Sequence, residues 1–103
     1  MKVGNCSLVI DNELLEQLDF EGMIVNALNP VLGMLVMSAK DDTFTLHIYM
    51  LQSQSEFEYH IDKKLTTKTF SSLVGMQYFL NKFSSYKASE FMEFVQKHDT
   101  QTH

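Results

Sequence analysis

Three consecutive segments in the middle of the chain alternate apolar and polar residues in the way β-strands do. They cover residues 31–38, 43–51 and 56–63, and short polar stretches separate them. Successive side chains of a strand point to opposite faces, so one face of the second segment is wholly apolar and carries Phe44, Leu46, Ile48 and Met50. The pattern predicts a meander of two β-hairpins.

The two ends of the chain follow other patterns. Residues 3–10 predict a first strand, and Asp11 can cap a helix that continues, alone or with a second short helix, toward Asn29–Pro30. A second helix is expected from Thr67 or Thr69 to about residue 83, and a last helix follows Ser84–Ser85. The predicted order is β-α-β-β-β-α-α.

This order predicts a small single α+β domain, in which an antiparallel sheet made of the three-stranded meander and the N-terminal strand packs against helices. The domain is expected to span residues 1–97, and residues 98–103 are expected to form a flexible C-terminal tail. With 103 residues and 45% hydrophobic content, the chain can bury one core.

Two histidines face each other if the second hairpin turns symmetrically about Ser53–Gln54. His47 then lies across from His60, with Glu58 as the nearest carboxylate, and directly opposed Cβ atoms are about 4.5–5.5 Å apart. Two imidazoles and one carboxylate form a known set of zinc ligands. The simpler interpretation is a half-solvated sheet face that carries polar residues because its other face is core.

The same register gives the outer face of the sheet several apolar side chains. These are Met34, Val36, Tyr49 and Leu51. A solvated face would not need them, so we expect either a protein partner, which includes a second copy in a homodimer, or cover by residues 12–28. A lysine at position 36 would on this interpretation leave the core intact.

Charge and composition exclude some function classes. The net charge is −5, all eight basic residues are lysines, and no arginine is present. An acidic chain without guanidinium groups is poorly suited to bind nucleic acid. The longest apolar run is too short to cross a membrane, and a single cysteine fits a reducing compartment. A cytoplasmic protein that binds neither nucleic acid nor membrane is expected.

The sequence contains no arrangement typical of an enzyme's active site: the glycines are isolated, and no serine has the pattern of a nucleophile elbow. We therefore expect a non-enzymatic protein–protein interaction module, such as an adaptor, an inhibitor or a small regulatory subunit, without catalytic residues or a cofactor. The alternative is a protein that binds zinc or a small ligand at His47, His60 and Glu58.

Overall fold

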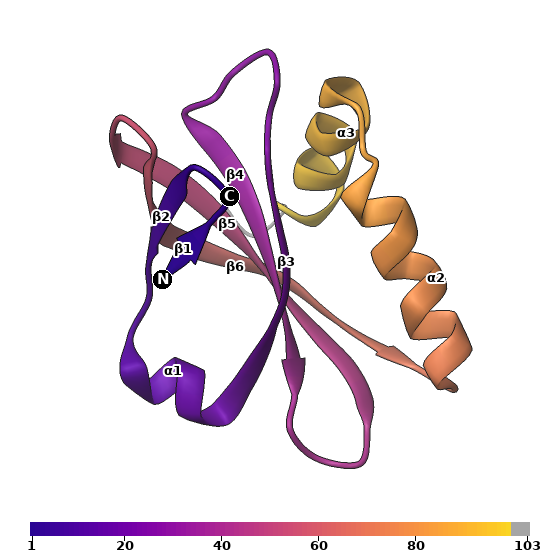
Figure 1. Cartoon of the computed structure of the whole chain (residues 1–103). Helices are drawn as coiled ribbons and strands as arrows, with labels where there is room; N and C mark the ends of the chain where they lie inside the picture. The colour runs from indigo at the N-terminus through magenta and orange to yellow at the C-terminus, as the bar shows by residue number, and fades with distance from the viewer. Residues whose placement is uncertain (100–103) are drawn as a thin grey trace.

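A six-stranded sheet organises the chain in the computed structural model, which describes residues 1–99 (Figure 1). The elements follow one another as β1 (Lys2–Val3), β2 (Cys6–Val9), α1 (Asn12–Gln17), β3 (Leu18–Val25), β4 (Leu32–Ala39), β5 (Phe44–Ser55), β6 (Glu58–Phe70), α2 (Leu73–Ser84) and α3 (Ala88–His98). The predicted α+β class and single domain are confirmed. No helix within residues 1–99 is both long and apolar enough to span a bilayer.

The strands lie in the order β1-β2-β6-β5-β4-β3. The predicted meander forms its centre, with antiparallel pairing of β4 with β5 and of β5 with β6. The predicted first strand is a small hairpin instead, because the chain turns at Gly4, where φ is +59°. Only glycine adopts such a backbone conformation without strain. The second strand of this hairpin, β2, pairs in parallel with β6.

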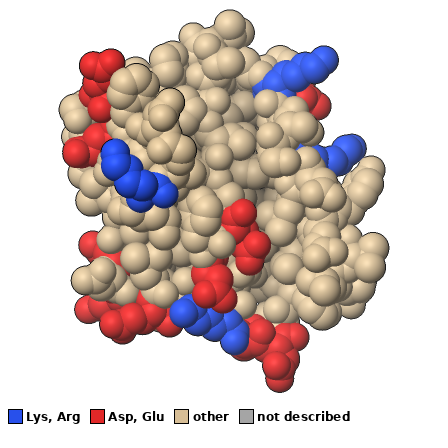
Figure 2. All heavy atoms as spheres, viewed as in Figure 1, with Lys and Arg blue, Asp and Glu red and all other residues tan. Residues whose placement is uncertain are grey.

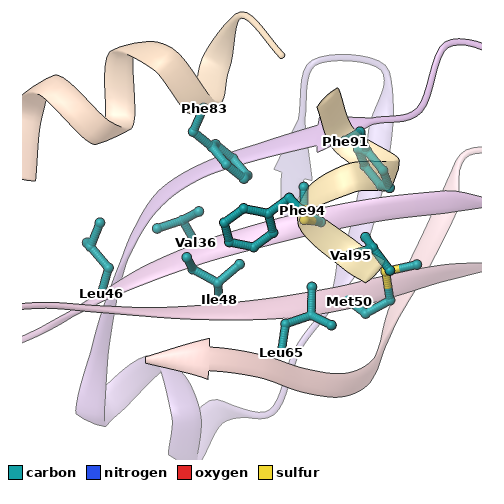
Figure 3. Packing of buried hydrophobic residues seen from close by; sticks show 10 residues of the cluster. Val36, Leu46, Ile48, Met50, Leu65, Phe83, Phe91, Phe94 and Val95 are labelled. Carbon is teal, nitrogen blue, oxygen red and sulfur yellow. The ribbon is translucent and has the colours of Figure 1, made fainter. Parts of the chain in front are cut away.

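One face of the sheet lies under α2 and α3, and we call it the helix-covered face (Figures 1 and 3). Its buried core consists of Met34, Val36, Leu46, Ile48, Met50, Leu65, Phe83, Phe91, Phe94 and Val95. Burying an aliphatic or aromatic side chain of this size contributes about 1.5–3 kcal/mol. This core is therefore the main energetic reason why the two C-terminal helices lie on the sheet.

The opposite face, called here the second face, carries its own apolar cluster. Its buried members are Leu8, Leu18, Leu35, Met37, Leu51 and Tyr59. The β1–β2 hairpin and α1 pack against this cluster through Cys6, Ile10, Leu14 and Leu15. Both sides of β4 are consequently covered, and all its residues from Gly33 to Ser38 are buried. The apolar run 31–37 is thus explained by a central strand.

Residues 18–25 form a strand, so the predicted continuation of the first helix is wrong. The helix α1 ends at Gln17, and β3 pairs with β4 from Leu18 to Val25. A bulge between Phe20 and Gly22 interrupts the alternation of apolar residues in this segment. This interruption makes the pattern resemble that of a helix, and pairing with β4 decides the outcome.

The predicted start of the second helix is also wrong. The strand β6 continues to Phe70, because its threonines favour extended backbone, and α2 begins only after Ser72. The Ser72 hydroxyl accepts a hydrogen bond from the Gly75 amide and so caps the helix. The last helix is predicted from the helical spacing of Phe91, Phe94, Val95 and His98. The first three are buried in α3, which extends to His98, the first residue of the predicted tail. Residues 100–103 of that tail lie outside the described residues.

Asn26 connects the β3–β4 loop to the start of α3 through hydrogen bonds. Its side-chain oxygen accepts hydrogen bonds from the amides of Leu28 and Asn29 at 2.9 and 3.0 Å, and its side-chain nitrogen donates to the Ala88 carbonyl. The side chain is buried, and these bonds compensate for its lost hydration. At the other end of α3, the Lys63 ammonium donates to Asp99 at 2.8 Å. These contacts connect the β3–β4 loop to the start of α3, and β6 to the end of α3.

Candidate functional site

The three residues predicted to bind a metal do not come together. His47 pairs with Thr67 of β6, whereas His60 pairs with Gln52 of β5. The two histidines are thus five residues apart along β5, or about 17 Å at 3.4 Å per residue. Glu58 and His60 do meet, with 3.0 Å between carboxylate and imidazole. Within residues 1–99, no three side chains of His, Cys, Asp or Glu are grouped so as to hold a metal ion.

The hairpin turn explains this difference. Instead of turning at Ser53–Gln54, the chain continues as β5 through Ser55 and reverses at Glu56 and Phe57. The register that opposes His47 to His60 would also pair Ile61 with Leu46, whereas Ile61 pairs with Leu51, a shift of five residues. A shift by an odd number exchanges the two faces of a strand. The predicted pairing of His47 with His60 is therefore wrong.

The four residues of the predicted interaction surface are not on one exposed face. Met34, Val36 and Leu51 are fully buried, and Tyr49 is half-buried. A first hairpin that turns at Lys40–Asp41 would pair Leu35 with Leu46, but Leu35 pairs with Tyr49, three positions further along β5. This odd shift places Met34 and Val36 on the helix-covered face and leaves Tyr49 and Leu51 on the second face. The prediction of one outer surface is wrong, because intramolecular packing covers both faces.

His47 lies on the second face beside Lys64, with 2.8 Å between its Nδ1 and the ammonium nitrogen. Partial burial and the positive charge of Lys64 lower the pKa of His47, although Asp41 acts in the opposite direction. Burial, Lys68 and Lys97 lower the pKa of His98 as well. The folded chain therefore favours the neutral form of both imidazoles.

These pKa shifts predict that acid destabilises the fold. An unfolded chain protonates its histidines near pH 6.5, whereas the folded chain resists protonation of His47 and His98 until lower pH. The stabilisation is thus present above pH about 6.5 and is lost as the pH falls toward the folded pKa values. Urea titrations between pH about 7.5 and 5.5 should show a decreasing free energy of unfolding. The decrease should be smaller in His47→Gln, and an equal slope in both proteins would contradict the prediction.

A hollow of about 410 Å³ lies between α1 and the second face. Asp11, Glu13, Leu14, Tyr49 and Ile61 contribute to its lining. Burial raises the pKa of Tyr49, so its phenol stays protonated at neutral pH. Carboxylates beside an apolar floor suit a cationic group better than an anionic one. The hollow lacks the juxtaposed nucleophile and base that would indicate a reaction.

The β5–β6 turn presents an aromatic side chain in a strained backbone conformation. Phe57 has φ +63°, the only positive φ of a non-glycine residue within residues 1–99. A left-handed conformation costs a residue with a Cβ about 1–2 kcal/mol, and glycine or asparagine would fit there more easily. The turn is held in place because the Phe57 carbonyl accepts a hydrogen bond from the Ser7 amide. The Phe57 side chain remains 54% exposed.

Phe57 borders an apolar hollow of about 310 Å³. The walls come from the β3–β4 loop and from β6, and we call the set Pro30, Val31, Phe57 and Tyr59 the Phe57 patch. The Tyr59 hydroxyl donates to the Pro30 carbonyl and so joins the two segments. Burial and the neighbouring Cys6 raise the pKa of Tyr59, which keeps this donor protonated. The patch is therefore a preformed apolar surface, with Glu56 and Ser53 at its margin.

The sequence pattern did not reveal this patch. The alternation of Phe57, Tyr59 and Ile61 in the sequence predicts that all three side chains point to the core face of the sheet. Tyr59 and Ile61 do pack in the cluster of the second face, but Phe57 lies one step beyond the end of the ladder, in the turn. The one signal in the sequence was the polar run Gln52–Ser55, which is long enough to extend the strand beyond the core and to place Phe57 in the turn.

No protein-family model matches this chain, and no curated protein or solved structure gives a significant match. Function therefore has to be inferred from the geometry of the chain itself.

Proposed function

We propose that this protein is a non-enzymatic protein–protein interaction module and that the Phe57 patch is its contact surface. The observation that carries the proposal is the exposed Phe57 side chain at φ +63°. Strained residues cluster at binding sites, where the surrounding structure holds them in place. A bulky aromatic residue in a position that favours glycine suggests that its side chain is kept for contact with another molecule.

The surroundings of Phe57 support this function. Exposed aromatic residues beside an apolar hollow are typical centres of interfaces, with polar residues at the rim. Here Val31 is 45% exposed, and Leu28, on the same loop, is 86% exposed. The nearby titratable pair, His60 with Glu58, is already engaged within the chain. These features favour recognition of an apolar side chain of a protein partner over chemistry on a substrate.

The test is the Phe57→Gly variant. Glycine keeps the left-handed turn and removes the aromatic ring, so we expect the thermal midpoint to stay equal or to rise slightly. Affinity capture from the cells that produce the protein should yield a near-stoichiometric partner with the wild type. Loss of one buried aromatic contact should weaken that partner's binding by about 30-fold or more, as measured by titration calorimetry.

Val9→Ala is the matched control, because it truncates another exposed apolar side chain, in β2 and outside the Phe57 patch. This variant should bind the partner as the wild type does. Equal binding by all three proteins would show that the Phe57 patch is not the contact surface. Absence of any captured partner with the wild type would contradict the interaction module itself.

A further inference from the structure

The outer face of α2 exposes several apolar side chains to solvent. The helix packs on the sheet through Met76, Phe79, Leu80 and Phe83. The opposite side, called here the α2 outer face, consists of Leu73, Val74, Gln77, Tyr78 and Asn81, all exposed. Val74 is 75% exposed and Tyr78 is 63% exposed. Two large apolar side chains one helical turn apart thus form a stripe that faces away from the fold.

This face carries no carboxylate in a chain where 20% of residues are charged, and its charged neighbour is the exposed Lys82, one helical turn beyond Tyr78. Between Leu65 and Asn81, seventeen residues, the single charged residue is Lys68. Its ammonium lies 5.7 Å from the centre of the Phe79 ring and 6.0 Å from that of Phe94, so it approaches the core aromatics rather than the α2 outer face. Figure 2 shows the corresponding flank of the molecule as a largely uncharged area.

Acidic side chains dominate the other exposed helices. In α1 they are Glu13 and Glu16, and in α3 they are Glu90 and Glu93. Acidic groups also gather along the lower edge in Figure 2, the edge of α1 and the β4–β5 connection in Figure 1. Two copies with a net charge of −5 each repel one another wherever such surfaces meet. The α2 outer face allows an approach without opposed carboxylates.

We propose that the α2 outer face binds a second copy of this chain, so that the protein forms a two-fold symmetric dimer through antiparallel α2 helices. A two-fold contact uses the same surface on both copies. The arrangement packs Val74 of each copy against Tyr78 of the other, and it sets the helix dipoles antiparallel. A stripe without carboxylates that carries a smaller and a larger apolar residue is complementary to itself in this way.

The one cation at the edge of the stripe fits this arrangement. Lys82 lies over the Tyr78 ring, with 5.5 Å between the ammonium and the ring centre. When Val74 opposes Tyr78, residue 82 of one copy lies level with residue 70 of the other. The two Lys82 side chains are then twelve residues apart along the helices, or about 18 Å at 1.5 Å per residue. Their repulsion is screened at that separation in ordinary buffers.

Sedimentation velocity over a concentration series tests the dimer. The wild type should change from monomer to dimer as concentration rises, and Tyr78→Lys should raise the dissociation constant about tenfold or more. Position 78 is exposed, so the variant should fold normally, which circular dichroism checks. Leu28→Lys is the matched control, since it adds the same charge at an exposed apolar position of the β3–β4 loop and should dimerise as the wild type does.

Cross-linking locates the contact. In a Cys6→Ser background, Gln77→Cys lies close to the proposed two-fold axis, and a short bismaleimide should join two copies through it. The same reagent should join far fewer copies of Leu28→Cys. A wild type that stays monomeric at every concentration overturns the proposal, as does a dimer that Tyr78→Lys leaves unchanged. Capture of a different protein through the α2 outer face, with no dimer, overturns it too.

Discussion

Val36→Lys is expected to prevent folding. Val36 is fully buried between the sheet and the two C-terminal helices, where its neighbours in the core are apolar (Figure 3). An ammonium group placed there loses its hydration without a partner, which costs several kcal/mol even after relaxation. A domain of this size is stable by only about 5–15 kcal/mol. Circular dichroism and the dispersion of amide resonances in a proton–nitrogen correlation spectrum should show an unfolded or severely destabilised chain.

Val9→Lys is the control for this substitution, because it places the same group on a valine that is 45% exposed in β2. Its thermal midpoint should stay close to that of the wild type. The comparison also tests the strand register. If position 36 faced solvent, as the alternation of residues first indicated, both variants would fold equally well, and the pairing of Val36 with Ile48 would be contradicted.

Phe83→Ala should lower the free energy of unfolding by about 3–5 kcal/mol. Phe83 is 2% exposed and belongs to the core between the sheet and the two C-terminal helices. Its ring centre lies 6.2 Å from that of Phe79 and 5.6 Å from that of Tyr86. Removal of the ring therefore leaves a cavity where α2 ends and the connection to α3 begins. Urea denaturation, followed by tyrosine fluorescence and far-ultraviolet circular dichroism, measures the loss.

The matched comparison is Phe57→Ala, which removes the same side chain from the exposed β5–β6 turn. This variant should change the free energy of unfolding by less than about 1 kcal/mol. Equal losses for Phe83→Ala and Phe57→Ala would contradict the assignment of the core.

The sequence pattern was sufficient to predict a helix or a strand where no second signal competed with it. Phe91, Phe94 and Val95 follow helical spacing, and all three are buried in α3. Leu46, Ile48 and Met50 alternate, and all three lie on the helix-covered face. In these segments local propensity and burial favour the same structure, so the class of each element could be predicted.

The register of the hairpins could not be predicted, because the position of the turn decides it. Polar residues 52–55 fit a turn as well as an exposed arm, and only the pairing of Ser55 with Glu58 shows that they are strand. The shift in register changes which residues share a face of the sheet. The predicted metal site of His47, His60 and Glu58 therefore does not form. The Phe57 patch depends on a three-dimensional contact of the turn with the β3–β4 loop, for which local sequence gives no signal.

The parallel pairing of β2 with β6 affects the order in which the chain folds during its synthesis on the ribosome. Leu8 of β2 pairs with Tyr59 of β6, which is synthesised about 50 residues later, so β2 cannot pair with β6 until then. At about 5–20 residues per second, the N-terminal hairpin remains undocked for several seconds, with Leu8 uncovered. Closure of this sheet edge is therefore a late event, and a nascent chain that stalls before β6 would present the N-terminal hairpin to chaperones or to other unfinished chains.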